Sequence, residues 1–352
     1  MPLKHRVLSY ARRLGLFRLA RLATARKIRI LAYHGIWLGD GHFGNFLYMS
    51  PDKFARRMAL LAEWGYPVVA LDAATAANGR GTLPKLATVI TIDDGWYGTW
   101  SKMLPELEHH GYPATLYLTT YYCLSQAPVV DVALQYCFHA GVADAIHLDG
   151  YGFGPFAMGT EAERQHALGA ALDRVASLAN DGERQAFLQA LCAAAGIDWH
   201  RMSAERWFHL MTAEEVADAG RRGIHFELHT HHHRISHRGQ DCLAEELAVN
   251  RDHITRLTGR SPRHFCYPSG RFTSAVWPTL ERCNIASATT TDIGLTDDRL
   301  PIYALPRILD GQDVSELEFE AEMSGFMELG RRLRGACRRW FTGGGSASAG
   351  GS

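Results

Sequence analysis

Leu86-Ala-Thr-Val-Ile-Thr-Ile-Asp93-Asp94-Gly95 is the stretch of sequence that decides the fold. Residues 86–92 are mostly apolar and β-branched, which is typical of a buried strand, and the Asp94-Gly95 pair favours a turn directly after it. The strand therefore delivers two adjacent carboxylates at its carboxyl end. Because α/β enzymes hold their chemistry at the carboxyl ends of parallel strands, this stretch predicts an active site as well as a strand.

A cluster of histidines, His229-Thr230-His231-His232-His233, follows another strand-like run at residues 223–228. Two histidines four residues apart, on one side of a helical turn, can bind the same metal ion, and a carboxylate can complete the set. The aspartate pair would supply that ligand and leave a second carboxylate to act as a base. Taken singly, the aspartates could form a solvated turn and the histidines a metal-sticky surface loop.

The rest of the chain alternates between strand-like and helix-like patterns. We predict seven strands, at residues 28–33, 86–92, 114–119, 223–228, 263–267, 286–291 and 303–308. Helical patterns lie at residues 51–64, 99–110, 212–222, 243–258 and 274–284. This alternation predicts an α/β fold with a parallel sheet.

The motifs and their order resemble the polysaccharide deacetylases of the NodB-homology type, carbohydrate esterase family 4. Thr91-Ile-Asp-Asp-Gly95 differs from the family's first motif only at its second residue, and His229-Thr-x-x-His233 matches the second motif. A third motif appears as Arg263-His-Phe-Cys-Tyr-Pro-Ser-Gly270, and Leu31-Ala-Tyr-His-Gly-Ile36 resembles the opening strand of the exopolysaccharide-deacetylase branch. The resemblance covers roughly residues 28–120 and 205–310 and implies an irregular (β/α) barrel with seven strands.

The resemblance also implies a reaction, the metal-dependent removal of an N-acetyl group from a glycan or glycan precursor. Asp94, His229 and His233 would bind a divalent metal, and their donor atoms suit zinc, cobalt or nickel better than magnesium or calcium. Asp93 would be the base that deprotonates the attacking water, and the backbone N–H of Ser269 would stabilise the oxyanion. The expected substrate contacts are Tyr267, Pro268 and Thr230, and Thr230 would steady either the substrate or a neighbouring ligand.

Two positions depart from the family pattern. The histidine of the last motif is replaced by Arg307, and an arginine is a poor general acid because its pKa exceeds about 12. The arginine that tunes the base in one branch is replaced by Cys266. Arg307 would either pair with a carboxylate or hold Asp93 ionised, and His34 would be either structural or catalytic. The alternatives are a catalytically degenerate glycan-binding relative and a deacetylase of a small or lipid-linked sugar at the membrane face.

Composition sets wider limits. The chain has 352 residues, with 37 basic and 37 acidic side chains, so no net charge recruits nucleic acid and we expect no such partner. A hydrophobic content of 47% is enough for one large core or two modest ones. Seven dispersed cysteines show no disulfide or zinc-ribbon spacing, which favours a reducing, cytoplasmic location.

The ends of the chain differ from its middle. Residues 1–30 carry nine Lys or Arg and no acid. We place a basic segment at 1–27, which would either rest peripherally on an anionic inner membrane face or form a solvated or core-docking helix. Arginines interrupt its apolar runs, so we predict neither a signal peptide nor a spanning helix. The barrel would occupy residues 28–310, with an insertion at 121–206 folding over its mouth. A helical segment at 311–341 and a disordered tail at 342–352 would follow.

Overall fold

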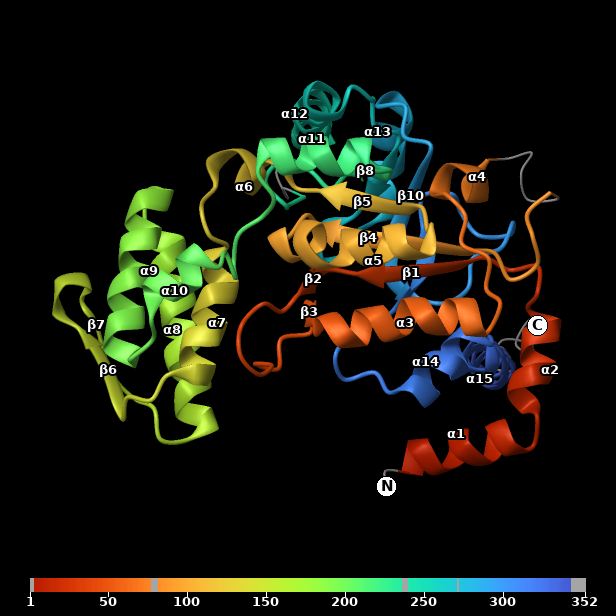
Figure 1. Ribbon diagram of the computed structural model, residues 1–352, viewed down its shortest axis with the longest axis horizontal. Coiled ribbons are helices and arrows are strands. Elements are labelled where there is room, and N and C mark those ends of the chain that lie inside the picture. Colours follow the sequence, from red (N-terminus) through yellow and green to blue (C-terminus); the bar gives the residue numbers. More distant parts are fainter. Residues whose placement is uncertain (1–2, 77–81, 236–239, 271, 343–352) are drawn as a thin grey trace, which may run out of the picture.

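Seven parallel strands close into a barrel in the order β1-β11-β10-β9-β8-β5-β4. The computed structural model describes residues 3–76, 82–235, 240–270 and 272–342 (Figure 1). The barrel strands are β1 (Arg29–Tyr33), β4 (Thr88–Asp94), β5 (Ala114–Leu118), β8 (Ile224–Leu228), β9 (His264–Cys266), β10 (Ser287–Ile293) and β11 (Leu305–Leu309). The predicted α/β fold, an irregular seven-stranded barrel, is confirmed.

The decisive strand, β4, is buried at all seven positions. This is expected for a barrel strand, because one of its faces packs in the barrel interior and the other packs against the surrounding helices. Its range differs from the prediction at both ends. Leu86 adopts a positive φ of 65° ahead of the strand, and pairing continues to Asp94 opposite Leu118 of β5. Both aspartates therefore belong to the strand itself, because the neighbouring strand extends the hydrogen-bonded ladder beyond the apolar run.

Helices surround the barrel. They are α3 (Pro51–Glu63), α4 (Leu71–Thr75), α5 (Leu104–His110), α11 (Ala213–Arg221), α12 (Gln240–Thr258) and α13 (Trp277–Arg282). The predicted helix at 99–110 begins with a π-helical turn, η1 (Thr99–Met103), and the one at 274–284 begins with a 3-10 turn, η4 (Ser274–Val276). Helix α11 starts at a capping box in which Thr212 and Glu215 satisfy each other's backbone N–H groups.

The segment between β5 and α11 forms a body with its own core. It contains α6 (Thr120–Ser125), α7 (Val130–Ala140), β6 (Ala145–Leu148), η2 (Asp149–Tyr151), β7 (Phe153–Ala157), α8 (Glu161–Ser177), α9 (Asp181–Ala195) and α10 (Trp199–Ala204). Its core includes Leu134 and Phe187 and continues into Trp37, Tyr48 and Trp96 of the barrel's loops. Figure 1 shows the body extending away from the barrel. It is thus anchored where β1 and β4 end.

Two short strands and four terminal helices complete the fold. β2 (Gly35–Ile36) and β3 (Tyr48–Met49) pair in parallel after β1. α1 (Leu3–Arg13) and α2 (Leu16–Ala23) pack with α14 (Glu316–Met323) and α15 (Phe326–Thr342). Within the described ranges, no helix is both long and apolar enough to cross a bilayer. Residues 343–352 of the predicted tail lie outside the described residues.

Candidate metal and catalytic site

Asp94, His229 and His233 converge at the carboxyl ends of β4 and β8. The Nε2 atoms of both histidines lie 3.3 Å from Oδ1 of Asp94. One ligand atom from each of the three side chains can be chosen so that all lie within 4.8 Å of one another. The three residues expected to bind metal are therefore brought together, although Asp94 and His229 lie 135 positions apart in the sequence.

The backbone turns at Asp94 itself. Asp94 has a φ of 72° and Gly95 a φ of 99°, so the strand leaves its extended path one residue earlier than the glycine alone would predict. A Cβ atom at Gly95 would lie 2.4 Å from Cδ1 of Leu118, so this position needs glycine for space as well as for conformation. The turn lets two consecutive carboxylates serve different partners within one site.

The histidine segment is not the helical turn that the four-residue spacing suggests. Residues 229–233 form an irregular loop in which Thr230 and His233 have positive φ values of 63° and 54°. The Thr230 hydroxyl accepts a hydrogen bond from the Arg234 N–H, and Thr230 is fully buried. Thr230 therefore closes the loop between the two histidines and has no exposed surface for the substrate contact predicted for it.

Neighbouring groups fix the orientation of His229. Its Nδ1 lies 2.8 Å from the carbonyl oxygen of Cys266; because a carbonyl only accepts, Nδ1 carries a proton, and Nε2 is the nitrogen that faces Asp94. The His229 N–H donates to Asn250, whose amide donates to the Leu118 carbonyl and to the Thr120 hydroxyl. Asn250 on α12 is fully buried and ties the ends of β5 and β8 together. Nothing in its local sequence signals this role.

These residues fit a divalent metal. Oδ1 of Asp94 is buried without a hydrogen-bond partner among the described residues, whereas Oδ2 accepts from the Trp96 indole at 2.9 Å. Burial lowers the pKa of His233 despite Asp94 nearby, which favours the neutral, ligating imidazole. Burial alone would raise the pKa of Asp94, but His233 and His229 hold it well below its usual value. Two neutral nitrogens and one carboxylate are typical zinc donors.

Asp93 faces a different partner. Arg307 of β11 contacts both of its oxygens, with Nη1 2.8 Å from Oδ1 and Nη2 2.7 Å from Oδ2. Burial would raise the pKa of Asp93, but the charge and hydrogen bonds of Arg307 outweigh it and hold the pKa below the ordinary value. Asp93, His229 and Cys266 also offer ligand atoms that lie within 4.8 Å of one another. We favour the Asp94 set, because Arg307 already occupies the oxygens of Asp93.

His34 also enters the site. It follows β1, and its Nε2 lies 3.6 Å from Oδ2 of Asp93. Its side chain is 20% exposed, compared with 3% for Asp93, so it can contact both the buried carboxylate and a molecule entering from solvent. Of the two roles that the sequence left open for His34, this position fits the catalytic one.

The third motif contributes mainly through its backbone and through Cys266. Sγ of Cys266 lies 3.3 Å from Nη2 of Arg307 and 3.6 Å from Asp93. The Tyr267 side chain is fully buried and donates to the carbonyl of Tyr303, and Pro268 is also buried, so neither side chain offers the substrate contact predicted for it. Ser269 is exposed with a φ of 57°. Its oxyanion role remains a prediction.

Other histidines of the cluster point elsewhere. His231 pairs with the Thr120 hydroxyl at 2.8 Å, and His232 pairs with Glu246 at 2.7 Å. In the sequence, His231, His232 and His237 are the members of the cluster that we expect at the rim of the site and not as metal ligands, and the contacts of His231 and His232 agree with this. His237 lies outside the described residues.

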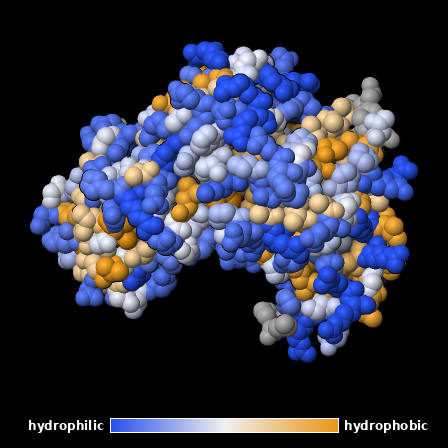
Figure 2. All heavy atoms as spheres, in the orientation of Figure 1, coloured by the Kyte–Doolittle hydropathy of each residue, from blue (hydrophilic) through white to orange (hydrophobic). Residues whose placement is uncertain are grey.

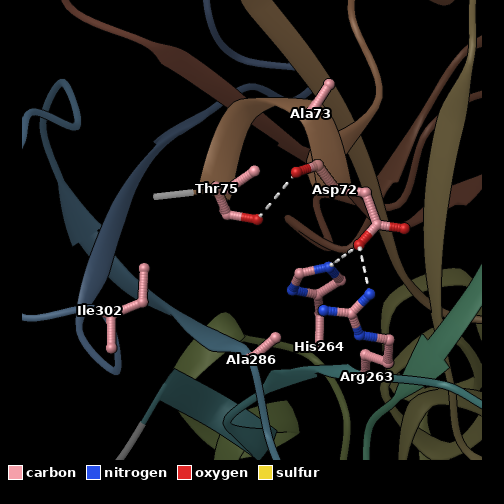
Figure 3. Close-up of a pocket in the computed structure, with 8 residues that line it drawn as sticks. Asp72, Ala73, Thr75, Arg263, His264, Ala286 and Ile302 are labelled. Carbon is pink, nitrogen blue, oxygen red and sulfur yellow. Dashed lines mark hydrogen bonds and ion pairs between the residues drawn. The ribbon is translucent and has the colours of Figure 1, made fainter. Parts of the chain in front are cut away.

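A cavity of about 740 Å³ lies at the opposite, amino-terminal end of the strands (Figure 3). There His264 bridges Asp72 at 2.9 Å and Ser287 at 2.8 Å, which superficially resembles a serine hydrolase triad. Ser287, however, is fully buried, so no substrate could reach its hydroxyl. The order of burial is also reversed, because the carboxylate of Asp72 is the exposed member. We therefore assign this group a structural role.

Comparison with known proteins agrees with this picture. Residues 188–288, which include His229 and His233, match the family model described as polysaccharide deacetylase. The Streptococcus pyogenes deacetylase PplD is 16% identical, with a TM-score of 0.57 over 84% of this chain and 98% of that chain. IcaB from Ammonifex degensii is 15% identical, with a TM-score of 0.55 over 85% and 97%.

A de-N-acetylase from Aggregatibacter actinomycetemcomitans is 14% identical, with a TM-score of 0.54 over 84% of this chain and 99% of that chain. No curated protein matches the chain in sequence. At these identities the solved structures establish a shared fold. Together with the family model, they confirm the resemblance to polysaccharide deacetylases.

Proposed function

We propose that this protein is a metal-dependent carbohydrate deacetylase that hydrolyses an N-acetyl group on a glycan or glycan precursor. The observation that carries the proposal is the pairing of two adjacent carboxylates with separate tasks. Asp94 meets two histidines, while Asp93 lies beside it in an ion pair with Arg307. A metal site next to an independent, ionised base is a combination that can hydrolyse an unactivated amide.

Asp94, His229 and His233 would hold the divalent metal, with zinc the first candidate and cobalt or nickel as alternatives. Such an ion polarises a carbonyl and lowers the pKa of bound water to about 7. Asp93 then acts as the base. Because Arg307 keeps it ionised within a buried environment, it can accept the proton of the attacking water without being solvated itself.

His34 supplies the group that the altered last motif lacks. When water has added to the acetyl carbonyl carbon, the carbon–nitrogen bond breaks only if the nitrogen receives a proton. Arg307 cannot donate one, because the charge of Asp93 raises its pKa further above an already high value despite burial. His34 borders both Asp93 and solvent, and we assign it the proton transfer. The products are acetate and a free amino sugar.

A catalytically degenerate glycan-binding protein was suggested by the missing acid and by Cys266. His34 offers an acid, and Arg307 offers the cation that Cys266 cannot, so we favour the enzyme. The comparisons support deacetylation in general; the metal dependence and the carbohydrate substrate are our proposals.

Acetate release from purified, zinc-loaded protein tests the function. The panel would contain N-acetylglucosamine oligosaccharides, a lipid-linked N-acetyl sugar and a nucleotide sugar, with Asp93→Asn as the inactive control. We expect release from at least one carbohydrate, abolished by chelation and restored by zinc. Binding of an oligosaccharide without any acetate release across the panel, in metal-replete protein, would favour the glycan-binding alternative.

A further inference from the structure

Exposed apolar side chains gather at one edge of the molecule. Among the described residues, 13 large hydrophobic side chains are exposed, and seven of these lie between residues 3 and 22. The seven are Leu3, Val7, Tyr10, Leu14, Leu16, Leu19 and Leu22, with exposures of 38% to 76%. Single exposed apolar residues are ordinary, but a concentration of this kind marks an interaction surface.

Helix α1 divides into two faces. Leu8 and Ala11 are buried against α14, whereas the exposed Leu3, Val7 and Tyr10 are spaced by four and then three residues. This spacing aligns them in one stripe along the helix, and Leu14 continues it just beyond the last turn. The stripe is therefore an outward-facing apolar surface on a helix whose other face is already packed.

Helix α2 repeats the arrangement. Phe17 is buried in the same small core and Ala20 is also buried, whereas Leu19 and Leu22 point outward with 60% and 69% exposure. The helix is held firmly in place: Arg29 of β1 donates to the Met323 carbonyl and to the Thr24 hydroxyl. The exposed leucines therefore belong to a helix that is held in a fixed position.

The α14–α15 turn shows how closely these helices meet. A Cβ at Gly325 would approach Thr24 Oγ1 to 2.4 Å, and Gly325 has a φ of 80°. Only glycine allows this contact. The four terminal helices thus form one platform on the barrel.

Basic side chains border the apolar stripe. Lys4 pairs with Glu318 and Arg12 pairs with Glu320 of α14. These two glutamates therefore neutralise basic residues on the side of α1 that packs against α14. Arg6, Arg13 and Arg18 are exposed. Residues 1–30 contain no acid that could neutralise them. Figure 2 shows hydrophobic atoms along the edge where α2 lies, with hydrophilic ones next to them.

We propose that this surface docks on an anionic lipid bilayer, with Leu3, Val7, Tyr10, Leu14, Leu19 and Leu22 entering the interface and Arg6, Arg13 and Arg18 meeting lipid phosphates. We call these nine residues the basic apolar face. An amphipathic surface of this composition binds by apolar burial together with attraction to anionic headgroups. The inference does not depend on the proposed deacetylase activity.

The charge pattern argues against a second copy of the chain as the occupant. In a symmetric dimer the same patch meets itself, so the exposed arginines of one copy would face those of the other. With no acidic residue in the segment, such a contact would be repulsive. An anionic lipid surface complements both the apolar and the basic parts of the face.

Vesicle flotation of the full chain tests the proposal. The vesicles would be phosphatidylcholine alone, or three parts phosphatidylcholine to one part phosphatidylglycerol. We expect binding to the anionic vesicles, weakened by salt because the charges are screened. Arg13→Gln/Arg18→Gln should weaken binding roughly thirtyfold, and Leu19→Gln/Leu22→Gln at least about tenfold.

Matched control variants change exposed residues of the same chemical type elsewhere. Val142→Gln/Val249→Gln removes two exposed apolar side chains, and Arg221→Gln/Arg256→Gln removes two exposed arginines. Both controls should float like the unmodified chain, and thermal unfolding should show that all four variants are folded. Equal binding to neutral vesicles, or unchanged binding by the leucine variant, would overturn the proposal. So would a dimer in light scattering that the leucine variant dissociates, without vesicle binding.

Discussion

Arg307 on β11 and Asp93 on β4 form a fully buried ion pair across the strand that separates them. Both strands pair with β1, so the two side chains meet inside the barrel, over the interior side of β1. Cys266 lies against the same guanidinium, with its sulfur 3.3 Å from Nη2. A second arginine at position 266 would place two like charges together. The small thiol therefore suits a site in which the cation comes from a different strand.

The first prediction concerns this ion pair. Arg307→Met should destabilise the protein by about 3–5 kcal/mol, because it leaves the buried carboxylate of Asp93 without its partner. The double variant Arg307→Met/Asp93→Asn should lose less free energy of unfolding than the two single variants lose together, because it also removes the unpaired buried charge of Asp93. Urea unfolding of the four proteins gives the coupling. Simple additivity would mean that the pair contributes little.

The second prediction separates the two aspartates. Asp93→Asn should retain bound metal but lose roughly 10²- to 10⁴-fold in activity, the usual contribution of a general base. Asp94→Asn should lose metal as well, because a carboxylate ligand is replaced by an amide. Metal content by mass spectrometry and acetate release are measured on the same samples. Equal metal loss in both variants would contradict the division of roles.

Histidines within one loop provide the third prediction. His233→Ala should reduce zinc content and activity together, whereas His232→Ala should leave zinc content unchanged, because His232 pairs with Glu246 and not with Asp94. His229→Ala should behave like His233→Ala. Equal zinc loss in the His232 and His233 variants would show that the loop as a whole, and not the identified ligand set, decides binding.

The fourth prediction tests His34 as the proton donor to the leaving group. His34→Gln should lower amide hydrolysis by about 10²- to 10⁴-fold. Hydrolysis of p-nitrophenyl acetate should fall much less, because nitrophenolate leaves without being protonated. Asp93→Asn should impair both substrates and serves as the comparison. If His34→Gln reduced both equally, His34 would be positioning Asp93 instead of donating the proton.

The fifth prediction concerns the pH dependence of stability that arises from Asp297, which pairs with a residue of α15. Asp297 contacts Lys27 and Arg332, each at 2.9 Å. Burial opposes ionisation, but these cations lower the pKa of Asp297 to about 2. Because the folded pKa lies below the unfolded value of about 3.9, the stabilisation is present above that value and disappears as the pH falls through about 2.

Asp297→Asn should therefore lower the melting temperature modestly at neutral pH, since partly exposed pairs contribute about 1 kcal/mol or less. The difference in melting temperature between this variant and the unmodified chain should become smaller as the pH is lowered. Asp298→Asn, at the exposed neighbouring position, should change little at any pH. A constant difference across the titration would exclude an electrostatic origin.

The sequence by itself determined the seven strands and the identity of the metal-binding candidates. β1, β4 and β5 are short, mostly apolar runs, and burial on both faces makes that signal strong in the local sequence. The motif spacing around Asp94, His229 and His233 selected three residues that the fold does bring together. Local patterns could also predict the exposed stripe of α1, but not that its opposite face would be docked.

Only the tertiary structure decided which contacts the residues of the site make with one another. The histidine spacing suggested a helical turn, yet contacts with Asn250 and the buried Thr230 hold an irregular loop with two left-handed residues. Arg307 and His34 are far from each other in sequence. The last motif pointed to Arg307 as a residue that could hold Asp93 ionised, but no sequence pattern placed His34 against the same carboxylate. Closure of the barrel places β4 and β11 on either side of β1, and this non-local pairing sets the charge of the catalytic base.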